Sequence, residues 1–245
     1  MTRGLVVSDF HLFSRRSVGE ELTAELDRRL ADCDVLVLNG DTFDFRWSRF
    51  SNEEATIQAA LDWMTRLMDR HPDVMLYYIL GNHDCLNSFR ENLEKLAESR
   101  QQLHWREHRL QLGGNLFLHG DCANWKMDEA ALARFRRGWS EDRPKGEFHK
   151  KLYDVVDSLG VCEFFHKKLF PAPIAVRRVA HHLDQVMEGW RNQIDHCFFG
   201  HTHFPFTDHD FDGVRFHNTG SAIRGLGFQP LNFAYESERV AENAA

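Results

Sequence analysis

Residues 74–84 read Val74-Met75-Leu76-Tyr77-Tyr78-Ile79-Leu80-Gly81-Asn82-His83-Asp84. The apolar and aromatic residues up to Leu80 predict a buried β-strand. The strand pattern stops at Gly81, and an amide, an imidazole and a carboxylate follow it. These three side chains can bind a cation or transfer a proton, so the end of this strand is a candidate functional site.

Four other apolar runs end in the same way. The runs and the polar residues after them are 5–7 with Asp9-Phe10-His11, 35–38 with Gly40-Asp41, 115–118 with His119-Gly120-Asp121, and 195–199 with Gly200-His201-Thr202-His203. Ligands of open α/β sheets bind beyond the carboxyl ends of the strands. We therefore expect all five polar clusters to meet at one edge of the fold.

The segments between the first strands have helical patterns. Apolar residues recur every four positions from Val18 to Leu30, and a second helical stripe runs through 57–68. The alternation of strands and helices predicts an α/β fold with right-handed crossovers and a largely parallel sheet. In the second half, Asp212-Gly213 indicates a β-hairpin between 204–211 and 214–218, and Gly113-Gly114 indicates another turn.

Residues 122–192 have helical character and no strand pattern. We interpret them as a helical cap inserted into a single domain that spans 1–245. Their charge also differs from that of the remainder. Residues 126–191 hold thirteen Lys and Arg and ten Asp and Glu, which gives this segment a net charge of +3. Because the whole chain has a net charge of −7, the remaining residues have a net charge of −10. The acidic body argues against a nucleic-acid partner, because such binding depends on neutralising phosphates.

Composition sets the class of protein and its expected compartment. Apolar residues make up 42% of the 245 residues and charged residues 27%, which is ordinary globular usage. The five cysteines include no closely spaced pair, which favours reduced thiols. The sequence has neither an apolar run of membrane-spanning length nor the pattern of a signal peptide at its start. We therefore expect a cytoplasmic protein.

Each polar cluster has an ordinary explanation when it is taken alone. Asp9 suits a helix N-cap, Gly40-Asp41 suits a turn, and His119 suits a hydrogen-bonded strand residue. Together, in this order and each at a strand end, the clusters are typical of a centre that holds two divalent cations. In such centres carboxylates, imidazoles and an amide oxygen surround the cations, and one carboxylate bridges them.

The ordered motifs D-x-H, G-D, G-N-H-D, H-G-D and G-H-T-H resemble those of the calcineurin-like metallophosphoesterase superfamily. The resemblance covers Asp9 to His203. It implies a double β-sandwich flanked by helices, in which Asp41 bridges the two cations. It assigns Asp9, His11 and His203 to the first cation and Asn82, His119 and His201 to the second. His83 would bind phosphate or donate a proton, and Asp84 would orient it.

The chemistry that this arrangement implies is the hydrolysis of a phosphoric ester or anhydride. Two cations that share a carboxylate also share a water molecule, whose pKa falls far enough to supply hydroxide for in-line attack at phosphorus. Mn²⁺ is the first expectation for the cations, with Fe and Zn²⁺ as alternatives.

The cap is the guide to the substrate. Its position and the segment Gly40-Asp41-Thr42-Phe43-Asp44 resemble the UDP-2,3-diacylglucosamine pyrophosphatase group of lipid A synthesis. A phosphorylated or lipid-linked substrate, and peripheral contact with the inner face of a membrane, would suit the apolar and basic cap. We take the candidate substrate-binding residues from the cap: Phe164, Phe165, Lys167, Lys168, Phe170, Arg177 and Arg178. The same phenylalanines would equally serve to pack the cap onto the body.

Two features favour other members of the superfamily. The lipid enzymes carry Arg where this chain has His83, and Asn218-Thr219-Gly220-Ser221 resembles the general superfamily ending. A nucleotide or cyclic-nucleotide phosphodiesterase, or a phosphatase, is therefore an alternative. A non-catalytic scaffold with this fold is another alternative. A scaffold is expected to have lost metal ligands, whereas this sequence has a suitable residue at every ligand position. The sequence leaves the oligomeric state open.

Overall fold

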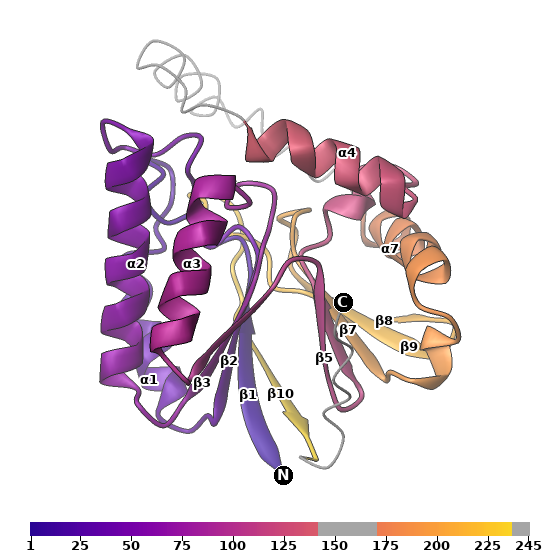
Figure 1. The fold of residues 1–245 in the computed structure, drawn as a ribbon. Coiled ribbons are helices and arrows are strands. Elements are labelled where there is room, and N and C mark those ends of the chain that lie inside the picture. Colours follow the sequence, from indigo (N-terminus) through magenta and orange to yellow (C-terminus); the bar gives the residue numbers. More distant parts are fainter. Residues whose placement is uncertain (142–170, 237–245) are drawn as a thin grey trace.

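The computed structural model describes residues 1–141 and 171–236 (Figure 1). Two five-stranded sheets pack against each other. The first has the order β10 (Leu231–Tyr235), β1 (Thr2–Val7), β2 (Val35–Asn39), β3 (Met75–Ile79) and β4 (Leu103–Arg106). The second has the order β5 (Arg109–Leu112), β6 (Asn115–Leu118), β7 (His196–Phe199), β9 (Val214–Asn218) and β8 (Phe206–Phe211). Strands β1 to β4 are mutually parallel, as are β6, β7 and β9, whereas β10, β5 and β8 are antiparallel to their neighbours.

Helices cover the outer face of each sheet. The helices are α1 (Thr23–Leu30), α2 (Glu53–Arg70) and α3 (Asn87–Ser99) beside the first sheet, and α4 (Glu129–Ser140) and α7 (Ala172–Val186) beside the second. Three apolar clusters fill the layers, one under each set of helices and one between the sheets. Phe117 and Phe198 of the second sheet stack in the central cluster and meet Phe233 of the first. The predicted double β-sandwich flanked by helices is confirmed.

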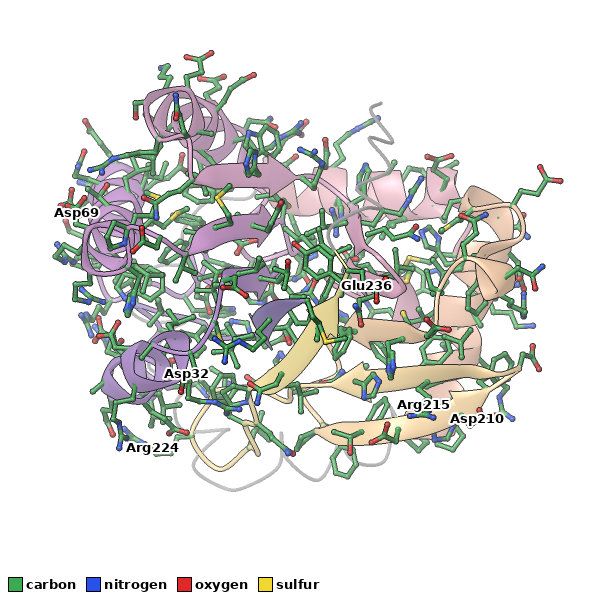
Figure 2. All side chains as sticks on the ribbon, turned by 90° about the horizontal axis from the view of Figure 1, so that it is seen from below. Asp32, Asp69, Asp210, Arg215, Arg224 and Glu236 are labelled. Carbon is green, nitrogen blue, oxygen red and sulfur yellow. The ribbon has the colours of Figure 1, made fainter. Side chains whose placement is uncertain are left out.

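Most charged side chains lie on the outside of these layers. Asp69, Asp210 and Arg215, for example, lie at the edges of the view in Figure 2, and all three are exposed. Among the described residues, no helix combines the length and the apolar character that crossing a membrane requires.

Buried polar residues join the carboxyl ends of the two sheets. The amide of Asn39, at the end of β2, donates to Leu118 O at 3.0 Å and to Phe198 O at 3.2 Å. Asn218, at the end of β9, donates to Gly200 O at 2.9 Å. These buried donors all have acceptors, and the bonds hold the strand ends together, so the polar clusters are brought close to one another.

The structure differs from the sequence prediction at the first helix. The stripe that begins at Val18 becomes regular helix only at Thr23, and the N–H of Val18 donates to Ala222 O at 2.8 Å. Part of the segment predicted to be a cap is described, and there α7 packs on the second sheet. Its residues Val176, Val179 and Leu183 pack in the cluster that holds Phe199 and Phe216 of the second sheet, so α7 is the outer layer of the sandwich.

Candidate metal centre

The structure brings the predicted cation ligands together. Asp9, His11, Asp41 and His203 form one group and Asp41, His119 and His201 another, and within each group the candidate ligand atoms lie within 4.8 Å of one another. Asp41 belongs to both groups. The third predicted ligand of the second cation, Asn82, places its Oδ1 3.3 Å from His119 Nε2.

Imidazole nitrogens face one another in both groups. His11 Nε2 lies 3.2 Å from His203 Nε2, and His201 Nδ1 lies 3.3 Å from His119 Nε2. Imidazole nitrogens that converge on carboxylate and amide oxygens form the donor set of a transition-metal site. The residues therefore fit two divalent cations that share Asp41.

The Asp9 and Asp41 carboxylates lie centrally in this cluster. Asp9 Oδ1 is 3.1 Å from His203 Nε2, and Asp41 Oδ2 is 3.3 Å from His119 Nε2. Burial raises the pKa of both carboxyls, but neighbouring histidines outweigh it, chiefly His203 for Asp9 and His119 for Asp41. Both pKa values end below the ordinary range, so both groups are ionised and able to bind cations.

The backbone at the ligands is held in an unusual conformation. Five ligand residues have positive φ angles: Asp9 (53°), His11 (46°), Asp41 (50°), His201 (63°) and His203 (58°). Left-handed backbone at such residues costs roughly 1–3 kcal/mol each and is concentrated at functional sites. Two glycines also leave room for the carboxylates, since a Cβ at Gly81 would collide with Asp41 and one at Gly200 with Asp9.

His83 is in neither group that contains Asp41, and with His11 and Asp44 it forms a third group of possible ligands. Its ring contacts that of His11, with centroids 4.8 Å apart, and its Nδ1 lies 3.1 Å from Asp44 Oδ1. The other oxygen of Asp44 is 3.6 Å from His11 Nδ1. Burial opposes protonation of His83, but the charges of Asp44 and Asp41 outweigh it and raise its pKa to about 9.

The expectation that Asp84 orients His83 is therefore corrected. Asp84 accepts hydrogen bonds from Thr42 N, Gly81 N and Tyr78 Oη at 2.6–2.8 Å. It fixes the loops that carry Asp41 and Asn82, while Asp44 is the carboxylate beside His83. In the sequence, Asp44 belongs to the segment Gly40-Asp41-Thr42-Phe43-Asp44, and its spacing of three residues from Asp41 is a signal that could have identified it.

The predicted substrate-binding residues are not brought to this centre in the described structure. Phe164, Phe165, Lys167, Lys168 and Phe170 lie outside the described residues. Arg178 donates to Ala123 O and Asn124 O, both at 2.8 Å, and so ties α7 to the segment after β6. Arg177 is exposed and lines a separate cavity of about 510 Å³ with Trp125 and Lys126.

The comparison with protein families agrees with this geometry. The model of the calcineurin-like phosphoesterase family matches residues 2–205. The chain belongs to this family. Its members' chemistry is metal-dependent phosphoester hydrolysis, and the clustered Asp and His residues are the corresponding candidate dimetal centre. No curated protein matches the sequence.

Several solved structures are similar to this chain at low identity. A dimetal phosphatase from Danio rerio is 14% identical with a TM-score of 0.50, over 96% of this chain and 99% of that one. Phosphopantetheinyl hydrolase from Mycobacterium tuberculosis is 14% identical with a TM-score of 0.46, over 89% of each chain. The phosphoesterase Yfce from E. coli is 14% identical with a TM-score of 0.39, over 91% of this chain and 83% of that one.

Metal binding to this centre should release protons. Burial disfavours the charged form of His119, but Asp41 and Asp9 outweigh it and raise the pKa of His119 in the metal-free protein to about 10. A ligand nitrogen must be deprotonated, so binding at neutral pH should displace this proton, and affinity should rise with pH up to about that value. Calorimetric titration of Mn²⁺ in buffers of different ionisation enthalpy measures the release. Equal heats in all buffers would contradict it.

Proposed function

We propose that this protein is a dinuclear-metal hydrolase of phosphodiester or pyrophosphate bonds. The observation that carries the proposal is that one buried carboxylate, Asp41, belongs to both ligand groups. When bound, two divalent cations at such a site lower the pKa of water and neutralise charge on phosphoryl oxygens. Manganese is the first candidate for these cations.

The residues around the ligands would divide the remaining tasks. Asp44 holds His83 through its Nδ1, which leaves the other ring nitrogen to meet the substrate. A protonated His83 there would bind a phosphoryl oxygen or donate a proton to the departing oxygen. Asn39 O lies 3.4 Å from His119 Nδ1 and orients that ring, so that its Nε2 faces Asp41.

The general reaction is tested with a chromogenic diester. Metal-free protein should not hydrolyse bis-p-nitrophenyl phosphate, added Mn²⁺ should restore hydrolysis, and renewed chelation should remove it. Hydrolysis that survives complete removal of metal, or that Mn²⁺, Zn²⁺ and Fe²⁺ all fail to restore, would contradict a dinuclear hydrolase. The second result would favour the non-catalytic scaffold.

We propose UDP-2,3-diacylglucosamine or a related acylated UDP-sugar as the substrate. The support is the sequence of the cap, with its apolar and basic residues. Membrane contact through the cap and a cytoplasmic location on the inner membrane face belong to the same proposal. The alternative is a soluble nucleotide or cyclic-nucleotide phosphodiesterase or phosphatase, which His83 favours.

Replacing Phe165 by serine separates the two substrate classes. If an acyl chain contacts this side chain, the lost apolar contact is worth roughly 1–3 kcal/mol. We expect kcat/KM for an acylated UDP-sugar to fall about ten-fold while that for the small diester is unchanged. A parallel fall of both rates and of the melting temperature would assign Phe165 to packing. No turnover of the acylated substrate by the wild type would favour the soluble phosphodiesterase.

A further inference from the structure

Arg136 is a buried arginine on α4, and its side chain is about 7% exposed. It is not a candidate metal ligand, and it lies in the segment that the sequence predicts to be a cap. Helix α4 lies above the carboxyl ends of the strands in Figure 1. Burying a guanidinium is costly unless its charge and its N–H groups are paired. Arg136 must therefore have buried partners for both.

All five N–H groups of Arg136 have acceptors. Nε donates to Asp121 Oδ2 at 2.7 Å, and Nη2 donates to Asp121 Oδ1 at 3.1 Å. The second Nη2 hydrogen reaches Leu80 O at 3.1 Å. Nη1 donates to Glu107 O and to His108 Nδ1. The planar guanidinium therefore uses its full set of donors, which a lysine with three donors cannot reproduce.

The acceptors belong to the loops that carry the second cation's ligands. Leu80 is two residues before Asn82, and Asp121 is two residues after His119. Leu80 extends from the first sheet and Asp121 from the second, while Glu107 and His108 form the link between β4 and β5. One side chain thus sets the distance between the two loops that must meet for Asn82 Oδ1 and His119 Nε2 to face the same cation.

The loops of the first cation have other supports. Asp9 N donates to Gly40 O at 3.0 Å, and His201 N donates to the Asp9 carboxylate at 2.9–3.0 Å. None of the bonds from Arg136 reaches a residue adjacent to Asp9, His11 or His203. Its influence is therefore directed at one half of the centre.

We propose that Arg136 is a positioning residue of the second metal position, acting through the Leu80 and Asp121 loops. The inference rests on the proposed dinuclear centre. It also gives α4 a role in the active site that is separate from substrate binding. Residues that support metal ligands in this way alter metal affinity by about 10–100-fold when they are replaced.

The test is Mn²⁺ binding to the metal-free full-length protein, followed by calorimetry and by electron paramagnetic resonance. The wild type should bind two Mn²⁺ and give the spectrum of an exchange-coupled pair. Arg136→Lys should bind the first Mn²⁺ as the wild type does and bind the second about 10–100-fold more weakly. At a Mn²⁺ concentration that fills both positions of the wild type, the variant should give the spectrum of uncoupled Mn²⁺. Arg137→Lys, at the exposed neighbouring position on α4, is the matched control and should behave as the wild type.

A lower melting temperature alone does not discriminate, because losing any buried ion pair destabilises a fold. The discriminating readout is the difference between the two metal affinities. Equal weakening of both, or unchanged binding of both with a coupled spectrum, would overturn the positioning role. Asp121→Asn, which keeps the shape of the partner, should reproduce the selective loss. If the wild type itself binds fewer than two Mn²⁺, the proposed dinuclear function fails instead.

Discussion

Replacing Asp41 by alanine should abolish hydrolysis and remove metal from both positions. Its carboxylate belongs to both ligand groups, and its Oδ1 also accepts from His83 N at 2.7 Å. Each cation would lose a charged oxygen ligand, and the cations would lose the group that holds them together. Metal content per chain and the rate of diester hydrolysis are the two measurements.

A surface carboxylate is the matched control for this substitution. Asp69 lies on the outside and pairs with Arg100 at 2.8 Å, so Asp69→Ala should leave metal content and rate unchanged. A variant lacking Asp41 that purifies with two metals and near-normal turnover would show that this carboxylate does not bridge them. Asp41→Asn retains the shape of the side chain and separates the loss of charge from a failure to fold.

Replacing His83 should give the opposite pattern, with metals retained and the rate reduced. The His83 ring contacts His11 but belongs to neither of the two ligand groups that share Asp41, so both cations should remain bound in His83→Ala. A proton donor contributes roughly 10²–10⁴-fold to the rate, and we expect a loss of that size. Asp44→Asn should lower the rate in the same direction, because Asp44 is the carboxylate at His83 Nδ1.

The readout that separates these roles is metal content at saturating Mn²⁺. If His83→Ala loses metal in proportion to activity, His83 is a ligand and not a proton donor. An unchanged rate for Asp44→Asn would mean that the 3.1 Å contact is not needed to place the ring.

Most of the site residues that could be predicted from the sequence lie directly after predicted strands. An apolar strand followed by Asp, Asn or His is visible as a pattern, and the topology of parallel strands places such ends at one edge. For this reason the meeting of the polar clusters at one edge of an α/β fold was predictable, whereas the two ligand groups and the double β-sandwich were implied by the resemblance to the family. The edge strand β10 had no such polar ending and was not predicted, although its pairing with β1 completes the first sheet.

Contacts made across the fold were harder to predict. Asp84 directly follows His83 in the sequence, yet its carboxylate turns to Tyr78 and to backbone N–H groups, and Asp44 takes its place. Arg136 sits in a helix among other arginines, and it falls on the apolar face because it follows Leu132 by four residues, whereas Arg137 does not. Only the three-dimensional structure shows that Asp121 pairs with its charge.

The presence of two cations that share Asp41 is the core of the proposed chemistry. Anomalous diffraction at the manganese edge, from crystals grown with Mn²⁺, measures it directly. We expect two peaks roughly 3.5–4 Å apart with the Asp41 carboxylate between them. Asp9, His11 and His203 should contact one peak, and Asn82, His119 and His201 the other. A single peak at saturating Mn²⁺, or two peaks of which only one touches Asp41, would contradict the dinuclear centre.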